Sequence, residues 1–124
     1  MNEESRQRLA RADTLLRLAN TLASEFPSDS ISRSFYAMFH AATAVLQERD
    51  IRRKSHKSLI AAFGEFIVKP GELNEKYHAF LRRAFERRNE SDYFVEPHDS
   101  EENAQHILKE AQEFVEACRR LIEQ

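Results

Sequence analysis

Glycine and proline are scarce in this chain of 124 residues, which has two glycines and three prolines. Because β-rich domains use these residues in frequent turns, their scarcity favours long helices. The glycines, Gly64 and Gly71, are isolated, which excludes the glycine-rich loops that bind nucleotide phosphates in many enzymes. Apolar residues make up 41% of the chain. The length suits one hydrophobic core, and we expect residues 1–124 to form a single domain.

Cysteine is also nearly absent. Cys118 is the only one, so the chain cannot form an internal disulfide, and no cysteine-based metal site is predicted. Cys118 falls on an apolar helical stripe, which predicts a small core residue. No apolar run approaches the roughly 20 residues that a membrane-spanning helix needs, and the charged N-terminus lacks the apolar core of a signal peptide. We expect a cytoplasmic protein.

The sequence carries no pattern of a metal or cofactor site. Two histidines separated by three or four positions would share one helix face and could bind zinc, but none of the five histidines is spaced in this way. The serines are scattered and show no signature of a nucleophile triad. We therefore predict neither a metal nor a cofactor. The five histidines are His40, His56, His78, His98 and His106.

Charge is nearly balanced overall but unevenly distributed. The formal net charge is −2, which does not by itself predict a nucleic-acid-binding protein. Residues 49–57 carry five basic side chains against one acid, and residues 82–88 carry four arginines against one glutamate. Basic clusters on helices are most often solvated faces, so their meaning depends on whether they converge in space.

Hydrophobic periodicity predicts five helices, at about residues 3–26, 28–49, 55–69, 74–93 and 100–122. Pro27 is expected to end the first helix, and the turn at residues 69–71 to end the third. Short connections between long helices indicate an all-α fold, an antiparallel up-and-down bundle of four long helices and a shorter one. Small residues in the second helix would allow a close helix crossing; they are Ala37, Ala41, Ala42 and Ala44.

Polar residues at the predicted helix starts supply candidate caps. Ser28 or Asp29 is expected to cap the second helix and Ser55 the third. Asn74 is expected to cap the fourth helix. Asp99, with Glu102 three positions later, predicts a capping box for the fifth helix. Residues 94–98, which include Pro97 and His98, are expected to form a loop.

Arg88 occupies an anomalous position near the end of the fourth helix. Spacing places it on the same helix face as Tyr77, Leu81, Ala84 and Ser91, where core residues are expected. An arginine on such a face needs a carboxylate, a cleft or a bound anion. Spacing alone favours an ion pair with Asp92 or an acid of the last helix. The other interpretation is that Arg88, beside Asn89 and a phenol, holds a phosphate in a polar cleft.

Three sequence blocks together resemble the HEPN domain, specifically its short, stand-alone prokaryotic members. The blocks are residues 33–42 (RSFYAMFHAA), 54–64 (KSHKSLIAAFG) and 85–93 (FERRNESDY), and the resemblance extends over about residues 5–122. It implies an all-α bundle that forms a two-fold dimer. Many HEPN proteins are metal-independent ribonucleases, in which an arginine, a polar residue and a histidine four to six positions after the arginine act on the scissile phosphate. Others are toxins paired with a nucleotidyltransferase antitoxin, or modules that bind RNA or a nucleotide without cleavage.

Carried over to this chain, the resemblance assigns the motif arginine to Arg88 and the polar residue to Asn89. Tyr93 stands in the histidine window, and a phenol with a pKa near 10 is a poor general base. The resemblance thus implies an RNA- or nucleotide-binding module with a degenerate motif, working with a nucleotidyltransferase-type partner. The alternatives are an active ribonuclease and a pure interaction module. His40 and His56 match positions where this subfamily has histidine and could supply proton transfer, whereas His98 lies outside the motif. Candidate phosphate- or RNA-binding residues are Arg53, Lys54, Arg83, Arg87 and Arg88.

Overall fold

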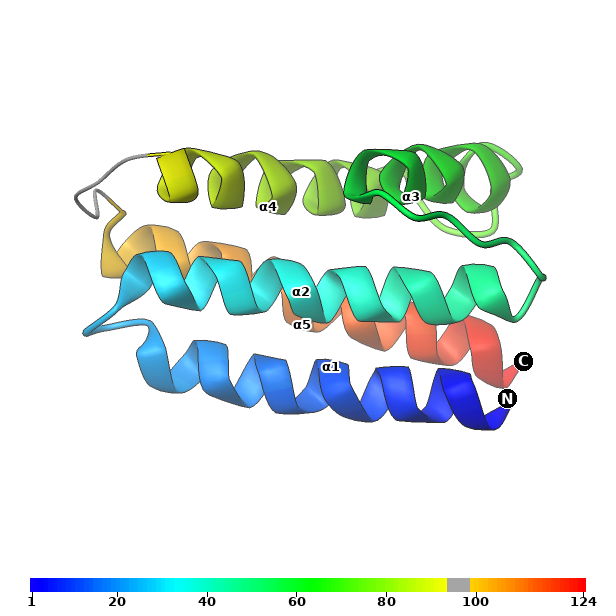
Figure 1. Cartoon of the computed structure of the whole chain (residues 1–124), viewed down its shortest axis with the longest axis horizontal. Coiled ribbons are helices and arrows are strands. Elements are labelled where there is room, and N and C mark those ends of the chain that lie inside the picture. The colour runs from blue at the N-terminus through cyan, green and yellow to red at the C-terminus, as the bar shows by residue number, and fades with distance from the viewer. Residues whose placement is uncertain (94–98) are drawn as a thin grey trace.

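The computed structural model describes residues 1–93 and 99–124, which form a helical bundle (Figure 1). Its long helices run antiparallel in succession, and the short α3 continues directly into a π-helical segment, η1. The described ranges contain no strand. The predicted all-α up-and-down bundle is confirmed. The elements are α1 (Glu3–Leu22), α2 (Pro27–Gln47), α3 (His56–Phe63), η1 (Gly64–Val68), α4 (Glu75–Tyr93) and α5 (Glu101–Glu123).

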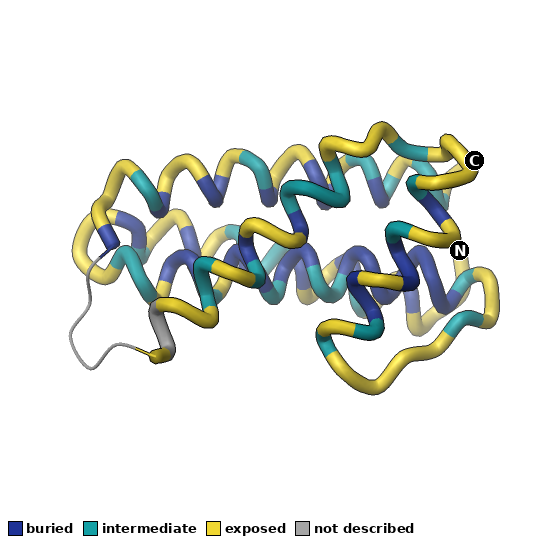
Figure 2. The backbone as a smooth tube through the Cα atoms, turned by 90° about the horizontal axis from the view of Figure 1, so that it is seen from above, coloured by how far each residue is buried: buried dark blue, intermediate teal, exposed yellow. Residues whose placement is uncertain are grey.

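Helix α2 is the central element, because it packs against α1, α3, α4 and α5. Figure 2 shows the buried positions turned toward the interior of the bundle. The hydroxyl of Ser30 donates a 2.7 Å hydrogen bond to the carbonyl of Ala19, which ties α2 to α1. The predicted small residues are all fully buried, as a close helix crossing requires. They are Ala37, Ala41, Ala42 and Ala44.

The start of α2 differs from the prediction. The helix begins at Pro27, and its N-cap, Phe26, makes no capping hydrogen bond through its side chain. Proline suits the first helical position because its fixed φ is helical and its missing N–H would have no partner there. The prediction that Ser28 or Asp29 caps α2 is therefore wrong. α1 ends at Leu22, four residues before the predicted end at Phe26.

The caps of α3 and α4 agree with the sequence. Ser55 forms a reciprocal capping box with Ser58 at the start of α3, and the Asn74 side chain accepts a 2.9 Å hydrogen bond from the backbone N–H of Lys76. The third helix was predicted as one α-helix, but its second half, η1, is π-helical. This wider helical geometry leaves no mark in hydrophobic spacing, and π-helical segments recur at functional sites.

The cap of α5 is Ser100, whose hydroxyl accepts a 3.0 Å hydrogen bond from the N–H of Asn103. The predicted capping box with Asp99 is wrong. The Asp99 carboxylate is instead buried, where it accepts a 2.8 Å hydrogen bond from Ser28 and pairs with Arg87. Cys118 is fully buried, as predicted, and burial raises the pKa of its thiol.

Residues 94–98, including the predicted loop at Pro97 and His98, lie outside the described residues. So does the side chain of Asp92, the predicted ion-pair partner of Arg88. Within the two described ranges, every helix is too short or too polar to span a membrane.

Candidate functional site

Arg88 lies on the inner face of α4, as its spacing predicts. Leu81 and Ala84 on the same face are fully buried in the core, and Arg88 itself is half-buried. The guanidinium carbon of Arg88 lies 5.1 Å from the ring centre of Tyr36 and 5.8 Å from that of Phe35. Each cation–π contact of this kind contributes about 0.5–2 kcal/mol, depending on desolvation. Two rings of α2 therefore hold the guanidinium in place.

His56, at the first position of α3, belongs to the same cluster. Its ring centre lies 5.3 Å from that of Phe35, 5.7 Å from that of Tyr36 and 4.8 Å from that of Phe39, all in edge-on geometry. Burial lowers the pKa of His56, and the positive charge of Arg88 lowers it further. The site thus combines a fixed cation with an imidazole that is neutral at pH 7 and can accept a proton. We call Arg88, His56, Phe35, Tyr36 and Phe39 the arginine–aromatic cluster.

His40, the other histidine proposed for proton transfer, has different neighbours. Its Nδ1 atom lies 3.0 Å from a guanidinium nitrogen of Arg8 on α1, so His40 accepts this hydrogen bond in its neutral form. Burial, followed by the charges of Arg8 and Arg11, lowers the pKa of His40 from 6.5 to about 4. Of the two candidates, His56 is the one whose pKa responds to Arg88.

We expect the ring of His40 to titrate near pH 4 in the folded protein and near pH 6.5 in the unfolded chain. The unfolded chain binds more protons between these values. The free energy of unfolding therefore falls as the pH drops from 6.5 to 4, by at most about 1.4 kcal/mol per pH unit for one proton. NMR titration of the ring measures the pKa, and His40→Gln should flatten the pH dependence in this window. A folded-state titration near pH 6.5 would contradict the prediction.

Two of the predicted phosphate-binding arginines form ion pairs with α5 or the residues before it. Arg83 is exposed on α4 and pairs with Glu110 of α5. Arg87 pairs with Asp99, whose side chain is completely buried, and this contact fixes the C-terminal half of α4 against the start of α5. Both arginines have a clear role in packing. Their role in phosphate binding stays a prediction.

The remaining predicted residues lie at two separate places. Arg53 and Lys54 line a cavity beside the end of α2, and the Arg53 guanidinium lies 5.9 Å from the ring centre of Phe66. Asn89 is exposed near the end of α4, and Tyr93 is 84% exposed. The structure therefore brings Arg88 and His56 together and places the other basic cluster elsewhere on the surface.

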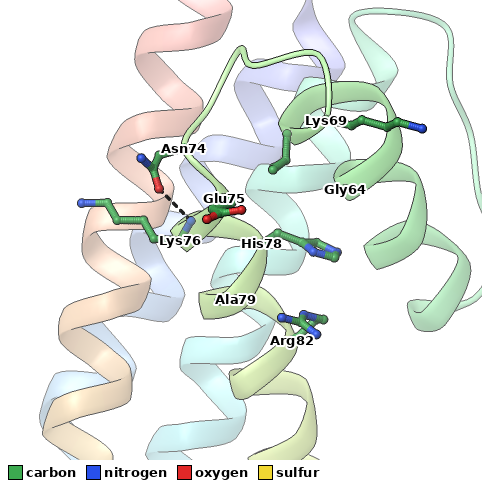
Figure 3. Close-up of a pocket in the computed structure, with 9 residues that line it drawn as sticks. Gly64, Lys69, Asn74, Glu75, Lys76, His78, Ala79 and Arg82 are labelled. Carbon is green, nitrogen blue, oxygen red and sulfur yellow. Dashed lines mark hydrogen bonds between the residues drawn. The ribbon is translucent and has the colours of Figure 1, made fainter.

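A further cavity, of about 560 Å³, lies between η1 and the first turns of α4 (Figure 3). His78 and Arg82 lie one turn apart on the side of α4 that faces η1, whereas Lys76 points away and pairs with Glu113 of α5. The Nε2 atom of His78 lies 3.1 Å from the carbonyl oxygen of Ile60. A Cβ atom at Gly64 would lie 2.8 Å from the His78 ring, so any larger residue here would force that ring to shift.

Comparison with known proteins matches the HEPN domain to residues 5–121. The chain belongs to the HEPN family. A UPF0332 protein of Gloeobacter violaceus is 32% identical over 126 aligned positions, which cover 100% of both chains. A UPF0332 protein of Thermotoga maritima is 31% identical over 82% of this chain and 77% of that protein. A protein of Methanocaldococcus jannaschii named "Putative toxin" is 30% identical over 77% of this chain and 71% of that protein.

Sequence reasoning on this HEPN domain located Arg88 but missed the rings beneath it. Tyr36 and Phe35 stand out in the sequence only as members of the block at residues 33–42. Both lie about fifty positions from Arg88 in the sequence. Nothing local to either helix signals the contact. The contact could have been predicted only from the packing of the two helices, which brings an arginine on one apolar face against aromatic residues on the other.

Proposed function

We propose that this HEPN domain binds a phosphate of RNA or of a nucleotide through Arg88. The observation that carries this proposal is the position of the guanidinium, held over Tyr36 and Phe35 and next to His56. A guanidinium has five N–H donors in one plane, so Arg88 can bind an anion while it keeps its other contacts. Charge-assisted hydrogen bonds of this kind contribute about 1.5–3 kcal/mol each.

The aromatic residues around Arg88 suit a nucleic-acid ligand better than a simple anion. Tyr36, Phe39 and His56 are half-buried, and each therefore retains some accessible ring surface. Bases stack on such rings with about 1–3 kcal/mol per base, with little dependence on sequence. Single-stranded RNA presents both a phosphate for the arginine and a base for the ring.

Binding to labelled RNA and to ATP, measured at several salt concentrations, tests the proposal. We expect Arg88→Ala to weaken binding about 10- to 100-fold, because it removes at least one charge-assisted hydrogen bond. Arg120→Ala, which removes an exposed arginine of α5, is the matched control and should change affinity little. Binding that is independent of salt, or equal in the wild type and Arg88→Ala, would refute the proposal.

A second candidate function is metal-independent RNA cleavage. It is favoured by the position of His56, because a neutral imidazole beside a fixed cation could accept the proton of an attacking 2′-hydroxyl while Arg88 stabilises the phosphate. The relatives named "Putative toxin" in Methanocaldococcus jannaschii are compatible with such an activity. The same RNA samples, incubated without metal and separated on a denaturing gel, distinguish the two functions. Cleavage lost in both His56→Ala and Arg88→Ala would establish the second.

We also propose that the domain works as a homodimer and with a nucleotidyltransferase-type protein partner. Support comes from the family membership and from the toxin names of the two archaeal relatives, since a toxin implies a neutralising partner. Tyr93 lies at the exposed end of α4 and Asn89 one turn earlier. Both residues are exposed on the end of α4 that carries Arg88, so a second chain that packs there would contact them.

A further inference from the structure

A second basic site lies at the C-terminal end of α2. It is a cavity of about 450 Å³ between α1, the end of α2, the loop that follows and the start of α3. This volume is within the range of about 300–1,000 Å³ that is usual for small-molecule sites. Its lining is Arg8, Phe39, Thr43, Gln47, Ile51, Arg52, Arg53, Lys54 and Leu59.

The cavity has more positive charge than its own acids neutralise. Arg52 pairs with Glu4 at 3.2 Å. Arg8, Arg53 and Lys54 form no ion pair with a carboxylate in the described parts of the chain, and Arg8 donates instead to the neutral ring of His40. The hydrogen bond from Arg52 lowers the pKa of Glu4, and the Glu4 carboxylate is also close enough to Arg8 and Gln47 for both to lower its pKa. Four basic residues therefore line the cavity, and Glu4 offsets part of their charge. A phosphate is the ligand that such a set of guanidinium and ammonium groups favours.

Gln47 adds an independent indication of a ligand. The residue is only 8% exposed and lines the cavity, and its side-chain oxygen is buried without a hydrogen-bond partner among the described residues. A buried acceptor of this kind calls for a specific explanation. Because an amide oxygen accepts hydrogen bonds and the surrounding charges are positive, the fitting ligand combines a phosphate with an N–H or O–H donor. A nucleotide unit has both, in its base or its ribose hydroxyls.

The cavity and the arginine–aromatic cluster are linked along one face of α2. Tyr36, His40, Thr43 and Gln47 follow helical spacing on this face, and the first and last of them are separated by about 16 Å. Arg88 lies over Tyr36, and Arg8 contacts His40 and lines the cavity. Phe39 belongs to both sites, because it contacts His56 and lines the cavity.

We propose that this cavity is a second RNA-binding subsite, which receives a nucleotide of the same strand whose phosphate is held by Arg88. The inference rests on the proposed function and extends it: the strand crosses α2 from Tyr36 to Gln47. Arg8, Arg53 and Lys54 hold a second phosphate, and Gln47 accepts a hydrogen bond from the nucleotide. An acidic segment of a protein partner could also meet these charges, but it would not explain the aromatic surface of Phe39 between the two sites.

Strand length provides the test. We expect an eight-nucleotide RNA to bind the wild type at least tenfold more tightly than a dinucleotide. The double variant Arg8→Gln/Lys54→Gln should abolish this gain. It should also reduce by about two the number of counterions released on octanucleotide binding, which the slope of log K against log salt concentration reports. Lys69→Gln, which removes an exposed lysine after η1, is the matched control and should keep the gain. In the wild type, adding the octanucleotide should shift the NMR signals of the Gln47 side-chain amide. This measurement does not depend on the folding of any variant.

The outcomes separate the two proposals. If Arg88→Ala weakens binding of both RNAs but the double variant keeps the length-dependent gain and the Gln47 signals do not move, the second subsite is refuted and the Arg88 site stands. If neither RNA binds, the proposed function fails and the extension fails with it. If inorganic phosphate or a polyglutamate peptide shifts Gln47 and the octanucleotide does not, the cavity serves a free anion or a protein, and the subsite for RNA is refuted.

Discussion

Replacing Phe35 with alanine is expected to lower the free energy of unfolding by about 3–5 kcal/mol, the cost typical of deleting a large buried aromatic side chain. Phe35 is fully buried, and its ring contacts those of Tyr36, His56 and Phe85 at 5.2–5.6 Å between centres. The substitution also removes one ring from beneath Arg88. We therefore expect the substitution to lower both the free energy of unfolding, measured by urea denaturation, and the affinity for RNA, measured by titration.

Phe26→Ala is the control for this prediction, because Phe26 is 50% exposed and should contribute less than about 0.5 kcal/mol. A second variant separates packing from the cation–π contact. Phe35→Leu keeps most of the volume and should cost less than about 1.5 kcal/mol, but it still loses a ring that holds Arg88. A loss below about 1 kcal/mol in Phe35→Ala would show that the packing around α2 is looser than described.

Replacing Asp99 with alanine is expected to destabilise the protein by about 3–5 kcal/mol, because deleting one member of a buried ion pair leaves its partner charge behind. The Asp99 side chain is completely buried, pairs with Arg87 and accepts a 2.8 Å hydrogen bond from Ser28. One carboxylate therefore connects α4, the start of α2 and the start of α5. Thermal unfolding of Asp99→Ala should show a large decrease in Tm.

Glu3→Ala is the matched control for Asp99→Ala, since it removes the carboxylate of an ion pair whose two side chains are about two-thirds exposed. Exposed pairs contribute about 0–1 kcal/mol, so the Tm should change little. Equal effects of the two substitutions would mean that burial does not strengthen the contribution of Asp99. If Asp99→Ala has the larger effect, Asp99→Asn is the next variant to measure. It removes the charge but keeps a side chain that can accept a hydrogen bond, and so separates the two contributions.

The sequence was sufficient for the fold because each long helix has its own apolar stripe and its own boundary. Ser55 and Asn74 cap helices as predicted, because a cap depends on the few residues that follow it. Asp99 also has the local sequence pattern of a cap. Its carboxylate instead pairs with Arg87, twelve positions earlier, and accepts a hydrogen bond from Ser28 in another helix. Competition from tertiary contacts is not visible in a local pattern. The π-helical η1 was not predicted either, because hydrophobic spacing does not distinguish it from an α-helix.

The site was predictable in part. An arginine on a core-facing stripe pointed to Arg88, and the HEPN resemblance, confirmed over residues 5–121, made it a phosphate-binding candidate. Two histidines were left open as its neighbours. Only the three-dimensional arrangement shows that His56 responds to Arg88 and that His40 responds to Arg8. The role of Gln47 could not be anticipated, because an amide in a helix has no sequence signal that separates a paired oxygen from an unpaired one.

The positions of the termini have a practical consequence for experiments on this domain. Both termini lie at one end of the bundle, and the end of α4 that carries Arg88 points toward the opposite end (Figure 1). α4 has 19 residues and is therefore about 28 Å long. A fluorescent protein or a surface-attachment tag fused at either terminus would stand well away from Arg88, but close to the end of α2 and its basic cavity. Immobilising the chain by its ends would thus leave one subsite accessible and crowd the other.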